Sequence, residues 1–183
     1  MQENYYAVTI GSITRHLPIC PINEEVAIAV FNILGDVEVT IAAAKALLAI
    51  APDFDVLVTA EAKSIPLIYE MARIAKKSRY IVARKSEKNY TKSRFSINVH
   101  SITTTVPQHL FLSEQDAALI RQQRIVIVDD VISSRHTLDA LTHLVHLAKG
   151  DIVGNMAVFA EGDANQHNDI LCLGHLPLFS VKT

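Results

Sequence analysis

An unbroken apolar run, Ile125 to Val128, limits this chain to few architectures. All four residues are β-branched and none alternates with a polar residue, which predicts a strand buried on both faces. Such strands occur in parallel sheets whose two faces are covered by helices. The run therefore favours an α/β fold and argues against a sheet with one face in water.

Helical and strand patterns alternate through the middle of the chain, which is typical of an α/β sheet with helices on its faces. Predicted helices cover residues 36–50, 65–75, 113–120 and 138–148, and predicted strands cover residues 55–60, 80–83, 124–128 and 151–159. Ser64 is predicted to cap the second helix and Gly150 to end the last one. Residues 170–173 and 178–179 are predicted to form short edge strands, whereas residues 1–35 follow no clear pattern.

Length and composition indicate one domain. The chain has 183 residues, of which 50% are hydrophobic and 20% charged, so it can bury one core and is not disordered. We expect a single domain over residues 1–183. No apolar run approaches the roughly 20 residues of a membrane span and the N-terminus lacks a secretory signal, so we expect a soluble, cytoplasmic protein. Cys20 and Cys172 are predicted to be buried free thiols, with a structural disulfide as the alternative.

Two acids and three hydroxyls follow the apolar run. Asp129 and Asp130 come directly after it, at the end of the strand where open α/β sheets bind their ligands. Adjacent carboxylates suit hydrogen bonds to ribose hydroxyls and can hold a magnesium ion through water. Ser133, Ser134 and Thr137 lead into a helix, whose free N–H groups can bind phosphate. The alternative is a pair of acids that only caps a turn or binds a lone magnesium ion.

Basic residues are concentrated between Arg73 and Arg94. This stretch of 22 residues holds nine of the 17 Lys and Arg residues but one acid, Glu87. A patch of this kind attracts an anionic ligand and stabilises charge on a leaving group. The alternative is a solvated helix end together with a nucleic-acid-binding patch. The net charge of −2 makes nucleic acid an unfavoured partner for the whole molecule.

The segment from Ile125 to Thr137 resembles the phosphoribosyl pyrophosphate (PRPP) motif of type I phosphoribosyltransferases. That motif is a hydrophobic strand, two acids, two apolar residues and a hydroxyl-rich loop that ends in Thr. The resemblance implies that Asp129 and Asp130 face the ribose hydroxyls and bind magnesium through water. It also implies that the loop holds the 5′-phosphate, through Ser133, Ser134, Arg135, His136 and Thr137.

Further segments resemble the same family in the same order along the chain. Arg84, Lys85 and Lys88 resemble its Arg-Lys-x-x-Lys segment, which contacts pyrophosphate and precedes a mobile loop. The segment Glu61–Ala62–Lys63–Ser64 resembles the acidic-small-basic-Gly loop that cradles pyrophosphate; the alternative is an ordinary loop with a capping serine. Glu161 lies where the adenine and xanthine branch of the family has an acid near the purine. The alternative is that Glu161 belongs to an ordinary turn formed with Gly162 and Asp163.

The resemblance implies a Rossmann-like, mostly parallel sheet flanked by helices, with a small hood built from the N- and C-terminal segments. It implies a purine-type transferase that moves the phosphoribosyl group of PRPP to a nucleobase and releases pyrophosphate. Asp129, Asp130, Arg84 and Lys85 would be the catalytic residues, Mg²⁺ the cofactor and a homodimer the assembly. The alternative is a non-catalytic regulatory protein of the same fold that binds PRPP or a nucleotide.

The phosphate loop departs from the family pattern at Arg135 and His136, where members have a Gly-containing pair. Glycine reaches positive φ and lets backbone amides approach phosphate, so these residues are expected to adopt unusual dihedral angles. Either two nitrogens of the Arg135 guanidinium bind the phosphate, or the Arg135 side chain fills the phosphate site. Ser64, where Gly is usual, is a milder departure.

Overall fold

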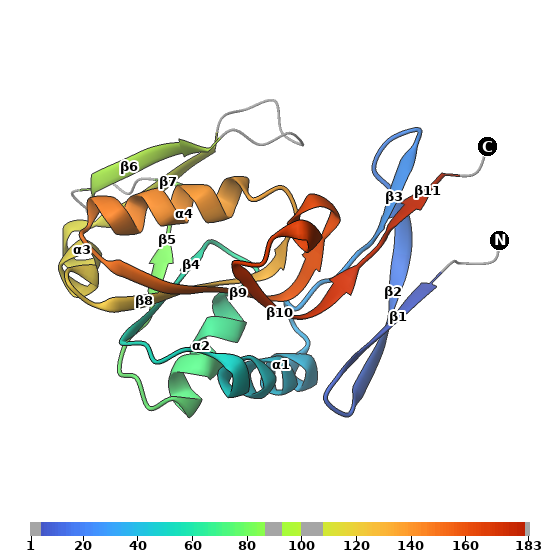
Figure 1. The fold of residues 1–183 in the computed structure, drawn as a ribbon, viewed down its shortest axis with the longest axis horizontal. Coiled ribbons are helices and arrows are strands. Elements are labelled where there is room, and N and C mark those ends of the chain that lie inside the picture. The colour runs from blue at the N-terminus through green and yellow to red at the C-terminus, as the bar shows by residue number, and fades with distance from the viewer. Residues whose placement is uncertain (1–4, 87–92, 100–107, 182–183) are drawn as a thin grey trace.

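A five-stranded parallel sheet lies at the centre of the molecule, with the strand order β10-β9-β8-β4-β5 (Figure 1). The computed structural model describes residues 5–86, 93–99 and 108–181. The strands are β4 (Val56–Ala60), β5 (Ile81–Ala83), β8 (Arg124–Ile132), β9 (Asp151–Glu161) and β10 (Ile170–Leu176), and each neighbouring pair is parallel. The predicted α/β class with a mostly parallel sheet is therefore confirmed.

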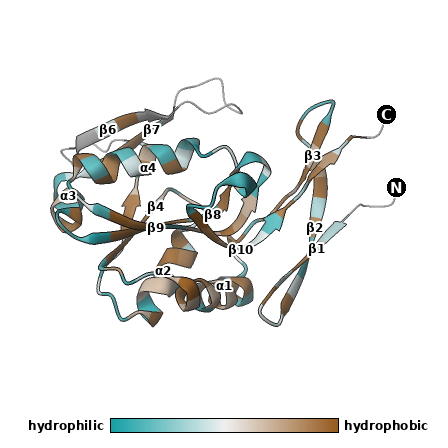
Figure 2. Ribbon diagram, viewed as in Figure 1, coloured by the Kyte–Doolittle hydropathy of each residue, from teal (hydrophilic) through white to brown (hydrophobic). Residues whose placement is uncertain are grey.

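Helices cover both faces of this sheet. The helices α1 (Val37–Ile50) and α2 (Ile65–Ile74) lie on one face, and α3 (Glu114–Ile120) and α4 (His136–Leu147) lie on the other (Figure 1). Along β8, Val126 and Val128 belong to the apolar cluster under α1 and α2, whereas Ile125 and Ile127 belong to the cluster under α4. This alternation explains why the run carries no polar residue, and Figure 2 shows the central strands as hydrophobic.

A smaller antiparallel sheet forms the hood, from both ends of the chain. Its strands are β1 (Tyr5–Ile10), β2 (Ile13–Pro21), β3 (Val26–Ala29) and β11 (Leu178–Ser180), in that spatial order. Phe31 and Phe159 meet edge to face at 4.9 Å, which joins the hood to the central sheet. Arg15 on β2 donates to Asp36 at 2.7 Å and to Glu38 at 2.8 Å, at the start of α1.

Two further strands, β6 (Ser93–Val99) and β7 (Gln108–Ser113), pair antiparallel as a ribbon beside α4. The backbones of Arg84 and Phe111 exchange two hydrogen bonds, of 3.0 and 2.9 Å, which joins this ribbon to the end of β5. A short 3₁₀ helix (Gly162–Gln166) follows β9. No helix within the described part of the chain is long and apolar enough to cross a membrane.

The structure corrects two predictions about single residues. The left-handed residue after α4 is Lys149, with φ of 64°, and not Gly150. Gly150 is needed for space instead, because a Cβ there would lie 2.6 Å from Cγ2 of Ile120. Both cysteines are free as predicted, but Cys20 is exposed and Cys172 half-buried. Side chains alternate along β2, so the inward position of Leu17 turns Cys20 outward.

Candidate functional site

The acid pair lies within β8 and not after it. The strand was predicted to end at Val128, but its pairing with β9 continues to Ile132, which lies opposite Ala160. Asp129 is half-buried, and Asp130 is buried with 5% of its surface exposed. The two carboxylates are therefore held by regular strand backbone near the carboxyl end of the sheet.

Ser64 joins the loop after β4 to the acid pair. Its hydroxyl donates to Oδ1 of Asp129 at 2.6 Å and lies 3.4 Å from Oδ1 of Asp130. The backbone N–H of Asp130 donates to the same hydroxyl at 2.8 Å. Ser64 is the N-cap residue of α2 as predicted, but its hydroxyl makes no capping bond to the helix and donates to a carboxylate instead. Pro66 lies in the first turn of α2.

The surroundings of the acid pair disfavour the ionised form of Asp129. Burial, together with the neighbouring charge of Asp130, raises the pKa of Asp129 to about 7, and the bond from Ser64 opposes this rise. Oδ2 of Asp130 is buried and has no hydrogen-bond partner among the described residues. Carboxylate oxygens in this state suit a divalent cation or a hydroxyl donor. Since the described residues contain no cluster of three metal-ligating side chains, water or substrate oxygens would complete the shell of an ion bound here.

The predicted phosphate loop encloses a small cavity. Residues 131–138 and Asp129 line a volume of about 50 Å³ between β8 and α4. Arg135 adopts the expected unusual conformation, with φ of 60° and ψ of −11°. Its guanidinium pairs with Asp169 and leaves the cavity open, so it does not fill the site. Nδ1 of His136 lies 2.9 Å from the hydroxyl of Ser134.

The structure brings two of the predicted pyrophosphate segments together. The carboxylate of Glu61 accepts a hydrogen bond from the backbone N–H of Lys85 at 2.9 Å and lies 3.6 Å from Nη2 of Arg84. The loop after β4 is thereby tied to the end of β5. Lys88, and with it the predicted mobile loop, lies outside the described residues.

A second cavity, of about 320 Å³, lies between the hood and the acid pair. Its lining includes Lys63, Asp130, Ser133 and Glu161, together with residues 28–31 of the hood. Glu161 is 8% exposed, and burial raises its pKa. The contribution of residues 28–31 was not predicted. The continuous apolar run from Val26 to Phe31 was the signal that could have identified a strand there.

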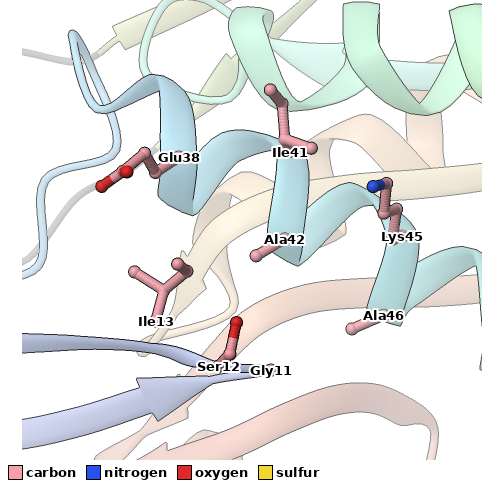
Figure 3. Close-up of a pocket in the computed structure, with 8 residues that line it drawn as sticks. All are labelled: Gly11, Ser12, Ile13, Glu38, Ile41, Ala42, Lys45 and Ala46. Atoms are coloured by element: carbon pink, nitrogen blue, oxygen red, sulfur yellow. The ribbon is translucent and has the colours of Figure 1, made fainter.

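Two other hollows contain none of the predicted site residues. One, of about 590 Å³, lies between the β1–β2 turn and α1, and Figure 3 shows Ile13, Ile41 and Ala42 around it, with Glu38 and Lys45 at its ends. The other, of about 350 Å³, lies between α1 and α2. Both hollows are lined mainly by apolar residues, whereas the predicted polar site residues line the two cavities beside the acid pair.

The fold and this site define the class of protein. Residues 36–174 match the family described as the phosphoribosyl transferase domain, and the chain belongs to that family. More particularly, two similar proteins are named for the purine bases hypoxanthine and guanine. The chain is 30% identical to the hypoxanthine/guanine phosphoribosyltransferases of two Methanococcus maripaludis strains, over 148 residues that cover 81% of this chain and 73% of each relative.

Solved structures show the same fold. Adenine phosphoribosyltransferase from Thermoanaerobacter pseudethanolicus superposes with a TM-score of 0.66 at 20% identity, over 78% of this chain and 84% of that one. The enzyme from Rhodothermus marinus superposes with a TM-score of 0.65 at 18% identity, over 93% of both chains. These comparisons confirm the predicted membership of the type I phosphoribosyltransferases and of their purine branch.

Proposed function

We propose that this protein transfers the phosphoribosyl group of PRPP to a purine base and releases pyrophosphate. The observation that carries the proposal is a pair of cavities that meet at the acid pair. Asp129 lines the smaller one, Asp130 lines the larger one, and Val131 and Ser133 line both. A sugar whose 5′-phosphate lies in the smaller cavity, of about 50 Å³, would extend past the acid pair toward the larger cavity, where a base fits.

Each end of PRPP has residues suited to it. Asp129 and Asp130 accept hydrogen bonds from the ribose hydroxyls, while Ser133, Ser134, Thr137 and the first amides of α4 hold the 5′-phosphate. Residues 61–64 with Arg84, Lys85 and Lys88 bind pyrophosphate, and their positive charge stabilises it as it leaves. Holding both reactants in line supplies much of the rate enhancement for such a transfer.

The acid pair suits a magnesium ion, because Asp130 Oδ2 is buried with no hydrogen-bond partner in the described part of the chain, and the raised pKa of Asp129 disfavours its ionised form. Asp129 and Asp130 would hold the ion through water, and it would neutralise negative charge on the pyrophosphate group. Glu161, at the wall of the larger cavity, is the residue we assign to the purine. By resemblance to the family we also propose that the protein works as a homodimer.

Calorimetric titration with PRPP and Mg²⁺ tests the proposal. We expect binding by the wild type and loss of binding by the double variant Asp129→Asn/Asp130→Asn. Asp53→Asn is the matched control, because the Asp53 side chain is 98% exposed and distant from the site. Release of pyrophosphate is then measured with adenine, hypoxanthine, guanine and xanthine.

The outcomes separate the transferase from a regulatory protein. Binding of PRPP with pyrophosphate release from one of the four bases supports the transferase. Binding without turnover of any base contradicts it and favours a protein that uses PRPP as a regulatory ligand. A folded wild type that binds no PRPP at millimolar concentration contradicts the transferase and favours a regulatory protein with a different ligand.

A further inference from the structure

Arg135 occupies an unusual backbone position. Four non-glycine residues of the described part of the chain have positive φ, namely Lys76, Gln122, Arg135 and Lys149. The other three follow the C-terminal ends of α2, α3 and α4, where left-handed residues are common, and all three are exposed. Arg135 instead precedes the first residue of α4, and 22% of its side chain is exposed. The left-handed form costs an L-residue about 1–2 kcal/mol, so another contact must hold it there.

That contact is an ion pair with Asp169. Nη1 of Arg135 lies 2.8 Å from Oδ1 of Asp169, and Nη2 lies 2.9 Å from Oδ2. Two parallel charge-assisted bonds fix both the distance and the plane of the guanidinium. Asp139 contributes less, because its carboxylate is 65% exposed and 3.8 Å from Nε. The Arg135 side chain therefore has one well-defined anchor.

The anchor is itself attached to the central sheet. Asp169 directly precedes β10, and its carbonyl oxygen lies 3.4 Å from Nδ2 of Asn155 on β9. The contact with Arg135 also holds the pKa of Asp169 below its usual range, so this carboxylate stays charged. The pair thus connects the turn before β10 to the loop that lines the smaller cavity.

We propose that Asp169 is a positioning residue, which holds the phosphate loop in its left-handed turn through Arg135. The inference rests on the proposed function, since the loop is the part assigned to the 5′-phosphate. The free N–H groups of the first turn of α4 follow Arg135 directly, so the backbone angle at Arg135 sets where they point. Asp169 also draws the guanidinium to itself, which assigns phosphate recognition to the backbone and hydroxyls of the loop.

The experiment is a double-mutant cycle on PRPP binding in the presence of Mg²⁺. We expect Asp169→Ala to raise the Kd for PRPP about tenfold, because the loop leaves the left-handed turn for much of the time. Asp139→Ala removes a carboxylate from the same arginine and is the matched control, with an expected change of less than about twofold. Arg135→Gly provides the second background for the cycle, since glycine adopts positive φ without an anchor.

The discriminating variant combines Arg135→Gly with Asp169→Ala. If Asp169 acts through the backbone of residue 135, its removal has no further effect in the glycine background. A residue that only stabilises the fold would weaken binding equally in both backgrounds. An unchanged or lower Kd for Asp169→Ala alone would overturn the inference, and a lower Kd would show that the released guanidinium binds phosphate itself.

Amide hydrogen exchange of residues 133–137 in the free protein provides a measurement that needs no ligand. Asp169→Ala should accelerate exchange there in the wild-type background and leave it unchanged in the glycine background. If the wild type binds no PRPP, the proposed function fails, and exchange alone decides whether Asp169 holds the loop. Exchange that is the same with and without Asp169 would overturn the inference whatever PRPP does.

Discussion

At the acid pair, one hydroxyl group partly offsets an electrostatic cost. Asp129 and Asp130 are adjacent carboxylates, one half-buried and one buried, and the Ser64 hydroxyl donates to Asp129 at 2.6 Å. The Ser64 hydroxyl oxygen also accepts a hydrogen bond from the N–H of Asp130, so this serine joins the loop after β4 to the backbone of β8. A glycine at position 64 would leave Asp129 without this donor. Ser64 therefore stabilises the ionised form of Asp129 and keeps its pKa from rising further.

Asp129 should make the protein less stable as the pH rises. Its pKa is about 7 in the fold against 3.8 as an ordinary carboxyl, so the folded state holds a proton that the unfolded state has lost between these values. The free energy of unfolding therefore falls from about pH 4 to pH 7 and is level above. We expect Asp129→Asn to raise it by roughly 1–3 kcal/mol more at pH 8 than at pH 5.

Urea unfolding of the apo protein at the two pH values measures this difference. Asp53→Asn, which removes an exposed carboxylate, serves as the control, with a change below about 0.5 kcal/mol at either pH. An equal effect of Asp129→Asn at pH 5 and pH 8 would show that Asp129 titrates normally in the folded state.

Some of these residues could be found from the sequence because their signal is local. Asp129 and Asp130 follow a run of four apolar residues, and the hydroxyls of the phosphate loop follow within eight residues. The contacts that organise them are not local. Ser64 lies 65 residues from Asp129, and Arg135 lies 34 residues from Asp169. No periodicity marks such a pair, so the sequence predicted the chemical groups but not their partners.

At the scale of elements, prediction succeeded where burial imposed one clear period. The strand β8 has apolar residues on both faces, and α2 buries Leu67, Ile68, Met71 and Ala72 along one face. The hood strands were missed for a physical reason. The strands β1 and β2 are largely exposed and partly polar, and few of their residues, such as Val8 and Ile10, are buried. Their stability depends on pairing between both ends of the chain, which a local pattern does not show.

Two neighbouring positions at the end of α4 favour glycine for different reasons: position 149 because of its positive φ, and position 150 because of crowding. Gly150→Ala should lower the free energy of unfolding by about 2–3 kcal/mol, because its Cβ would lie 2.6 Å from Ile120 and 2.9 Å from Val145. Lys149→Gly should raise it by about 0.5–1 kcal/mol, because Lys149 is exposed and holds φ of 64°. Urea unfolding of both variants at one pH measures the two effects.

The opposite signs make each variant the control for the other. If Gly150→Ala were neutral, Ile120 and its neighbours would have room to move aside, and the glycine would not be needed for packing. If Lys149→Gly were destabilising, the lysine side chain would make a favourable contact that outweighs its backbone strain.

At the scale of the whole molecule, the hood and the central sheet share one core. The cluster under α1 and α2 includes Val8, Leu17 and Phe31 from the hood region together with Val126 and Phe159 from the sheet. Arg15 adds a polar connection to Asp36, which also caps α1. The larger cavity of the site has walls from both parts, so its shape depends on their staying together.

We therefore propose that residues 1–183 unfold as a single domain. The chain has no tryptophan, so Tyr6→Trp places one fluorophore in the hood, where Tyr6 lies 5.7 Å from Phe179. The urea transition followed by tryptophan fluorescence should coincide with the transition followed by far-UV circular dichroism, which is dominated by the helices that cover the central sheet. The shared apolar cluster is the reason, because exposing the hood side of this core would also expose Val126 and Phe159.

Phe31→Ala sharpens the test, because Phe31 is 5% exposed and contacts Phe159 across the boundary. In the Tyr6→Trp background it should lower the free energy of unfolding by about 3–4 kcal/mol and move both transitions together. A fluorescence transition at lower urea than the dichroism transition would instead make the hood a separate unit. In that case the hood would open while the acid pair stayed folded, and the larger cavity would be lost before the smaller one.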